Sequence, residues 1–139
     1  MRVADLLKKK GSSVVTLSAS ATVADLLNTL DDNKIGAVVV VDDDQVVGIV
    51  SERDVVHHLR GGVDTHAAVG SIMTDEVNTC APEDELNDLA ARMTEGRHRH
   101  MPVLRDGSLQ GIVSIGDVVK ARLDSLEAER DVLEDYLRR

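Results

Sequence analysis

One seven-residue motif occurs twice in this chain of 139 residues, and it constrains the fold more than any other feature. The first copy, Gly48 to Asp54, reads Gly-Ile-Val-Ser-Glu-Arg-Asp, and the second, Gly111 to Asp117, reads Gly-Ile-Val-Ser-Ile-Gly-Asp. Each copy is followed by Val-Val, and the two copies lie 63 residues apart. A long repeat of this kind indicates a structural unit that is present twice.

Within each copy, the residue types predict a strand that runs into a helix. A glycine leaves a turn, two β-branched residues end the strand, and a serine and an aspartate three positions apart begin the helix. The carboxylates of Asp54 and Asp117 are therefore expected in a first helical turn, beside unpaired N–H groups and the positive end of the helix dipole. Such a position at the carboxyl end of a strand suits ribose hydroxyls and phosphate. The same spacing is that of a capping box, which satisfies backbone groups and binds nothing, so both interpretations stay open.

The remaining sequence predicts the same order of elements in both halves: strand, helix, strand, strand, helix. A first helix over residues 1–9 ends at Gly11. The expected strands cover 14–17, 37–41, 46–51, 77–80, 100–104 and 109–114, and the expected helices cover 23–30, 54–60, 83–94 and 118 onward. Gly36 to Val39 matches His100 to Val103 at an offset of 64, which predicts that the loop before this strand differs by one residue between the halves.

Beyond Ala121 the chain has no counterpart in the first half. A heptad-like stripe, interrupted at Arg130, consists of Leu123, Leu126, Leu133 and Leu137. We therefore expect the last helix to continue through the tail, and to pack on a partner subunit or back on its own domain.

Composition excludes several classes of function. With 16 basic and 25 acidic residues the net charge is −9, which repels a polyphosphate backbone. The chain has no Trp, no Phe and one Tyr, so it cannot build the aromatic platforms that stack bases, and we expect no nucleic-acid partner. No stretch of 18 apolar residues and no cleavable leader is present, which predicts a cytoplasmic protein without a membrane segment. The single cysteine, Cys80, has no disulfide partner and is expected to be buried in a strand.

Taken together, these features resemble the tandem CBS-domain pair, or Bateman module. The resemblance spans residues 1 to about 122 and rests on the two Gly-h-h-Ser-x-x-Asp motifs, on Ile72-Met73-Thr74, and on Arg-His-x-Pro-Val at 99–103. It implies an α+β fold of two β-α-β-β-α repeats related by a pseudo-two-fold axis. CBS repeat 1 would cover 1–62, CBS repeat 2 would cover 63–122, and a C-terminal helical extension would cover 123–139. The chain is similar to stand-alone bacterial pairs and to the module inserted in inosine monophosphate dehydrogenase.

For function, the resemblance implies a non-catalytic regulatory module that binds an adenosine ligand. AMP, ADP or ATP is the expected ligand, and NAD and S-adenosylmethionine belong to the same class; no cofactor is required. Such a module senses energy state and modulates a regulated partner protein or its own oligomer, here a homodimer. The alternatives are a structural interaction protein with degenerate clefts and a nucleotide-processing enzyme. No Ser/His/Asp or Cys/His set supports an enzyme, and the only run of carboxylates is the turn at Asp42.

The resemblance also implies two symmetry-related nucleotide clefts. In the first, Asp54 would accept the ribose hydroxyls, and the other members would be Ser51, Val77, Asn78, His98 and Arg99. In the second, Asp117 takes that role, together with Ser114, Ser13, Val14, Lys34, Ile35 and Gly36. The candidate phosphate contacts are Arg99, His100, Arg53 and Lys10, and the set is completed by Met101, Pro102 and Gly116.

The two expected clefts differ in their basic residues. Arg53 is matched by Gly116, and the Arg-His-Met-Pro run at 99–102 is matched by Ile-Gly-Ala-Val. We therefore predict that the clefts are unequal in affinity or in ligand. His98 and His100 lie two apart, but metal ligation would need further ligands that the sequence does not supply, so we predict no metal site; a phosphate contact and a solvated edge remain the alternatives for this pair.

Overall fold

The repeated motif forms a strand that runs directly into a helix in both halves of the chain. In a computed structural model that describes residues 1–139, β3 (Gln45–Ser51) leads into α3 (Glu52–Arg60), and β5 (Ser108–Ser114) leads into α5 (Ile115–Arg138). Each junction is a serine N-cap whose hydroxyl accepts from the backbone N–H of the aspartate three residues later. The predicted position of both aspartates in a first helical turn is confirmed.

The other elements follow the predicted order, with one exception. They are α1 (Val3–Lys10), β1 (Thr16–Leu17), α2 (Val23–Asn33), β2 (Ala37–Asp42), the 3₁₀ turn η1 (Val69–Ser71), α4 (Leu86–Gly96) and β4 (His100–Arg105). The predicted strand at 77–80 is wrong, because only Cys80 pairs there, in a single parallel bridge to Val103. The next N–H, that of Ala81, donates to the Asp84 carboxylate at 2.8 Å and begins the turn toward α4.

Two small sheets carry the hairpins. The first has the order β1-β2-β3, with β1 parallel to β2, and the second consists of β4 and β5. Ala37 pairs with Ser51, and His100 pairs with Ser114, so the hairpins correspond at an offset of 63. The predicted offset of 64 is wrong: the preceding helices both end at a left-handed residue, Lys34 and Arg97, and the loops have equal length. Because β2 contains a run of valines, its sequence aligns with that of β4 almost equally well when shifted by one residue, and the predicted offset followed the shifted alignment.

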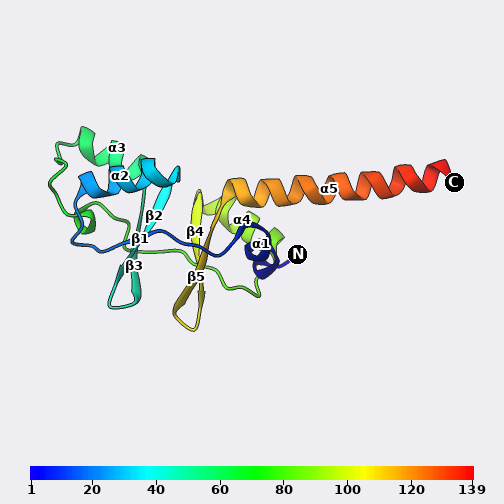
Figure 1. Cartoon of the computed structure of the whole chain (residues 1–139), viewed down its shortest axis with the longest axis horizontal. Coiled ribbons are helices and arrows are strands. Elements are labelled where there is room, and N and C mark those ends of the chain that lie inside the picture. Colours follow the sequence, from blue (N-terminus) through cyan, green and yellow to red (C-terminus); the bar gives the residue numbers. More distant parts are fainter.

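Each half is completed by a segment that comes before the other half. Three α1 residues, Val3, Leu6 and Leu7, pack in the core formed by α4, β4, β5 and the start of α5. In return, Val69 and Ile72, in and after η1, pack in the core formed by α2, β2, β3 and α3. The predicted boundary at 62/63 does not separate the two cores, because each core contains residues from both sides of it. As a result, the end of α1 lies beside β5 rather than in its own half, as Figure 1 shows.

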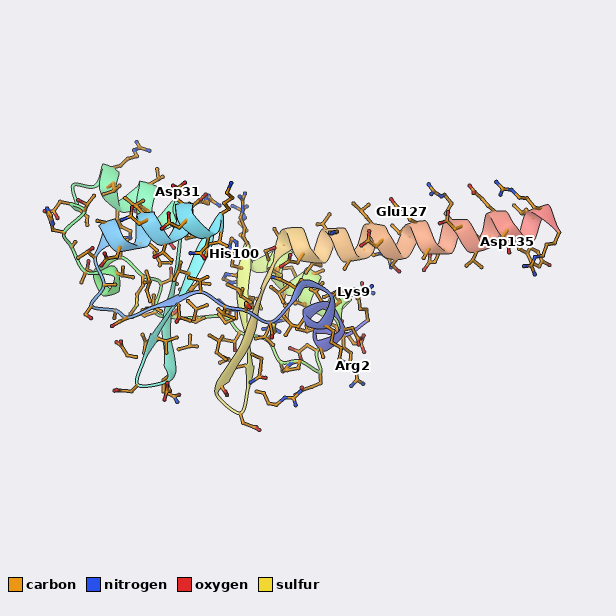
Figure 2. All side chains as sticks on the ribbon, in the orientation of Figure 1. Arg2, Lys9, Asp31, His100, Glu127 and Asp135 are labelled. Carbon is orange, nitrogen blue, oxygen red and sulfur yellow. The ribbon has the colours of Figure 1, made fainter.

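Helix α5 continues well beyond the second half, as predicted. It runs unbroken through 24 residues, and every residue from Arg122 onward is exposed. Figures 1 and 2 show it as a rod that projects from the body, with Glu127 and Asp135 on its free part. The alternative that the tail packs back on its own domain is therefore wrong. No helix of the chain is both long and apolar enough to cross a membrane.

Candidate functional site

Two cavities lie where residues of the two halves meet, one beside each repeated motif. Cleft 1, beside Asp54, has a volume of about 480 Å³, and cleft 2, beside Asp117, has a volume of about 390 Å³. Both volumes lie in the range of cavities that hold small organic ligands. The carboxylates therefore have room beside them, which the capping interpretation alone did not require.

In cleft 1, the Asp54 carboxylate uses a single oxygen to cap its own helix. Its Oδ2 accepts from the Ser51 backbone N–H at 2.8 Å and from the Ser51 hydroxyl at 3.1 Å. The Asp54 backbone N–H donates back to Ser51 Oγ at 3.3 Å, which completes a capping box. The second oxygen, Oδ1, has no hydrogen-bond partner in the chain, so the carboxylate can cap the helix and still accept from a ligand.

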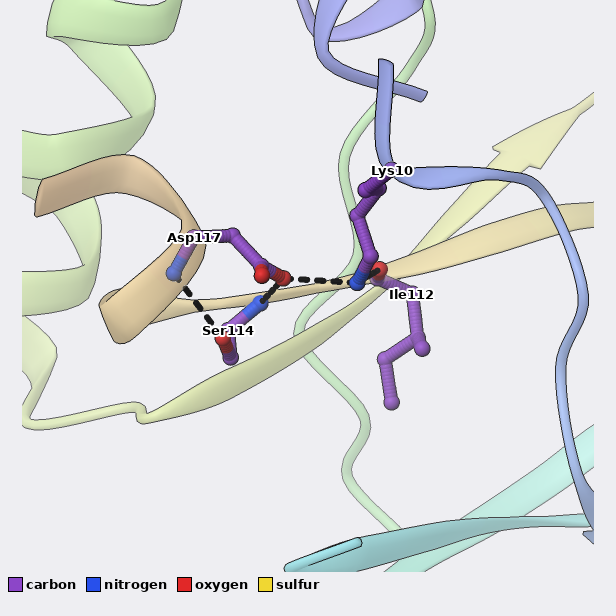
Figure 3. Close-up of polar contacts among 4 residues, drawn as sticks. All are labelled: Lys10, Ile112, Ser114 and Asp117. Carbon is purple, nitrogen blue, oxygen red and sulfur yellow. Dashed lines mark hydrogen bonds and ion pairs between the residues drawn. The ribbon is translucent and has the colours of Figure 1, made fainter. Parts of the chain in front are cut away.

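In cleft 2, the corresponding carboxylate is also bound by a cation. Asp117 Oδ2 accepts from the Ser114 backbone N–H at 2.9 Å and from Lys10 Nζ at 2.6 Å (Figure 3). Lys10 Nζ donates in addition to the Ile112 carbonyl at 2.8 Å. Burial raises the pKa of Asp117, but the hydrogen bonds from Lys10 and Ser114 outweigh it, so the pKa lies below its ordinary value. Asp117 is therefore held ionised through Oδ2, while its Oδ1, like that of Asp54, has no hydrogen-bond partner in the chain.

His100 stands between the two clefts and lines both of them. Figure 2 shows it where β4 faces the first half. A Cβ placed on Gly36 would lie 3.4 Å from the imidazole Cε1 and Nε2, so only a small residue at position 36 leaves the ring in place. Burial lowers the pKa of His100 below its ordinary value; the Asp117 charge opposes this effect, and the charges of Lys10 and Arg99 add to it. A neutral imidazole therefore separates the clefts near pH 7.

The clefts differ in their free cations. Cleft 1 is lined by three guanidinium groups, those of Arg53, Arg97 and Arg99, and none of them forms an ion pair within the chain. Cleft 2 is lined by two ammonium groups, of which Lys10 is paired and Lys34 is not. Unpaired guanidinium groups are well suited to bind phosphate oxygens in pairs.

Most of the predicted site residues line one cleft or the other. Cleft 1 contains Gly36, Ser51, Arg53, Asp54, Asn78, His98, Arg99 and His100. Cleft 2 contains Lys10, Ser13, Val14, Lys34, Ile35, Gly36, His100, Ser114 and Asp117.

Four predicted residues lie outside both cavities: Val77, Met101, Pro102 and Gly116. Met101 is 1% exposed and belongs to the second core, and Pro102 is buried beside it in β4. Their neighbour His100 reaches the clefts because it begins the strand. Gly116 is exposed in the first turn of α5 and contributes no side chain, and Val77 is half-buried beside Asn78.

The sequence comparison missed several lining residues. Cleft 1 is also lined by Ala37, Ile49, Glu52, His57, Thr74, Glu76 and Arg97, and cleft 2 by Val15, Ala37 and Ile112. Arg97 had a signal in the sequence, since it lies 63 residues after Lys34, which was predicted to line the other cleft. No group of three or more His, Cys, Asp and Glu side chains is arranged to hold a metal ion.

A family model confirms the class of protein that this geometry defines. The model described as the CBS domain matches the chain twice, over residues 3–61 and 69–124. The chain therefore belongs to the CBS-domain family, and its fold is a tandem CBS-domain pair with one cleft beside each repeated motif.

Solved structures and curated proteins include close relatives. The CBS-domain containing protein ATU1752 from Agrobacterium tumefaciens is 44% identical, with a TM-score of 0.83 over 88% of this chain and 99% of that one. The CBS domain protein PAE2072 from Pyrobaculum aerophilum, solved complexed with AMP, is 26% identical, with a TM-score of 0.77 over 84% and 89%. The mitochondrial CBS domain-containing protein CBSX3 of Arabidopsis thaliana is 33% identical over 97% of this chain and 71% of that protein. Two longer relatives are matched over 39% and 32% of their length, so this chain corresponds to one part of each.

Proposed function

We propose that this chain is a non-catalytic regulatory module that binds adenosine nucleotides in its two clefts. The observation that carries the proposal is the Asp54 carboxylate, which caps a helix with Oδ2 and keeps Oδ1 free beside a cavity of about 480 Å³. A relative of the same fold has been solved in complex with AMP, which supports the same ligand class here. AMP, ADP and ATP are the first ligands to test, before NAD and S-adenosylmethionine.

In cleft 1, Asp54 accepts the two ribose hydroxyls, and the phosphates lie toward Arg53, Arg97 and Arg99. The cavity holds no Phe, Tyr or Trp, so the adenine lies against aliphatic and imidazole side chains, among them Ile49 and His98. Because the three guanidinium groups have no internal ion pairs, a phosphate would not have to displace an existing partner. Cleft 1 is therefore the tighter nucleotide site of the two.

Calorimetry on matched variants tests the proposal. A hydrogen bond to a charged group contributes about 1.5–3 kcal/mol, so Asp54→Asn should weaken AMP binding at cleft 1 about tenfold or more. Asn keeps the size and the capping oxygen, and Thr22→Ser, a conservative change at the N-cap of α2 and outside both clefts, serves as the control. Two identical sites, or heats unchanged by the Asp54 substitution, would contradict the proposed assignment. If no adenosine ligand at millimolar concentration raised the melting temperature, the structural alternative with degenerate clefts would replace the proposal.

We further propose that the module acts through another chain rather than through turnover. Apolar side chains on the helices remain exposed, including Val56 at 60% and Val119 at 50%. Such surfaces support a symmetric homodimer, with a regulated protein as a further partner. Native mass spectrometry would report the oligomer and any retained ligand, and chromatography of incubated nucleotides should show no product; turnover would establish the enzyme alternative.

A further inference from the structure

Lys10 breaks the symmetry between the two halves at one backbone carbonyl. In the first half, the Ile49 carbonyl accepts from the Thr74 backbone N–H at 2.8 Å. The equivalent carbonyl in the second half, that of Ile112, accepts instead from Lys10 Nζ at 2.8 Å. A side-chain ammonium therefore takes the place of a backbone donor on the outer edge of β5.

The cause is the difference in length between α1 and η1. Gly11 lies 63 residues before Thr74, but its N–H caps α1 by donating to the Leu7 carbonyl at 2.8 Å. The Ile112 carbonyl therefore accepts from the side chain of Lys10, the last residue of α1. The residue 63 positions after Lys10 is Met73, which carries no charge and precedes Thr74, a lining residue of cleft 1.

The same ammonium also pairs with one oxygen, Oδ2, of the carboxylate of cleft 2. Lys10 Nζ lies 2.6 Å from Asp117 Oδ2, and the two side chains are only 29% and 25% exposed. Asp54, by contrast, forms no ion pair. A ligand that enters cleft 2 therefore meets a carboxylate whose charge is already balanced, whereas a ligand that enters cleft 1 does not.

We propose that Lys10 makes cleft 2 selective for phosphorylated adenosine ligands over adenosine itself. The inference rests on the proposed function and deepens it. A neutral nucleoside brings no charge, so its ribose hydroxyls must donate to a carboxylate whose charge is shared with the Lys10 ammonium through Oδ2. A phosphate in the same cavity offers the ammonium a second anion, and the long lysine side chain can turn from Asp117 toward it, which leaves the carboxylate to the ribose hydroxyls. Adenosine therefore binds cleft 2 more weakly than AMP does.

The alternative is that Lys10 only supports the fold by satisfying the Ile112 carbonyl. In that case its loss would lower stability and weaken both ligands by the same factor. Selectivity would change only if Lys10 exchanges its partner during binding. The ratio of the two dissociation constants, adenosine over AMP, therefore separates the two roles.

The experiment uses the full chain with Asp54→Asn, which weakens cleft 1, and the calorimetric titrations are fitted with two sites so that the cleft 2 dissociation constant is obtained separately. In this background AMP should bind more tightly than adenosine. Adding Lys10→Met, which copies the residue at position 73, should tighten adenosine and reduce the ratio about tenfold, since one charge-assisted contact is exchanged. Lys9→Met is the matched control, because Lys9 lies next to Lys10 in α1, is exposed and forms no ion pair. Lys10→Arg keeps the cation and should keep the preference for AMP.

The outcomes are distinguishable. If Asp54→Asn binds both ligands and Lys10→Met leaves their ratio unchanged, the role of Lys10 is overturned while the proposed function stands. If Asp54→Asn binds neither AMP nor adenosine, cleft 2 is not a nucleoside site, and the inference falls with it. Should Lys10→Met not fold, the lysine ¹³Cε signals of the wild-type chain decide: AMP and adenosine must shift the Lys10 signal differently, and equal shifts overturn the proposal.

Discussion

Removing the Asp117 carboxylate should destabilise the chain more than the same change at Asp54. Both aspartates cap a helix through a backbone N–H, and Asn retains an acceptor at each site, so the capping loss is shared. Only Asp117→Asn also breaks the 2.6 Å contact to Lys10 Nζ. Exposed ion pairs contribute about 0–1 kcal/mol, and breaking a buried pair costs about 3–5 kcal/mol. For side chains about one-quarter exposed, we expect the difference to be about 1–2 kcal/mol.

A double-mutant cycle with Lys10→Met isolates the pair from the capping term. Urea unfolding should be followed by circular dichroism, because the single Tyr136 is 75% exposed on the tail and does not report on the core. The coupling between Asp117→Asn and Lys10→Met should be about 1–2 kcal/mol, whereas Asp54→Asn and Lys10→Met should be additive within about 0.5 kcal/mol. If the coupling between Asp117→Asn and Lys10→Met were also below about 0.5 kcal/mol, the Lys10–Asp117 pair would be a solvated surface contact that adds no stability.

Three further predictions follow from residues around the clefts and cores. The pKa of Asp117 in the folded chain is lowered, so the stability that its ionised form contributes is present at neutral pH and is lost as pH falls through that pKa. The urea midpoint should therefore fall less between pH 7 and pH 2 for Asp117→Asn than for the wild type. Gly36→Val should weaken AMP at both clefts in calorimetry, because the added methyls meet the His100 ring, while Gly36→Ala stays close to the wild type. Burial raises the pKa of Cys80 to about 11, so a thiol reagent at pH 8 should label Cys80 only as fast as the chain unfolds, and rapid labelling of the folded protein would contradict its buried place.

The hairpins and their following helices could be predicted from the sequence because the signals there are local. A glycine, two β-branched residues and a Ser-x-x-Asp box fix the strand-to-helix junction within seven positions, and the junction recurs at Ser51 and Ser114. The placement of Asp54 and Asp117 followed from the same box. The cavities beside them could be expected only from the family resemblance, since a cap and a ligand site share one spacing.

The crossover of the cores could not be predicted from periodicity. The stripe Val3, Leu6, Leu7 shows that α1 buries one face, but nothing local says which half receives it. The same holds for the Lys10 contact, which joins residues 107 positions apart. The strand predicted at 77–80 failed for a related reason: its β-branched residues favour extended backbone, but only Cys80 finds a partner on β4.

The inequality of the clefts follows from the crossover rather than from the motifs. Both motifs carry the same Ser-x-x-Asp box, and both capping boxes have nearly the same bond lengths. The segment that reaches each motif from outside differs, because an eight-residue helix arrives at β5 and a three-residue turn arrives at β3. The longer helix uses the N–H of Gly11 for its own cap and ends in Lys10, so its last side chain must serve both the edge of β5 and Asp117. Duplication of a unit therefore does not duplicate its site when the segments that complete the two copies differ in length.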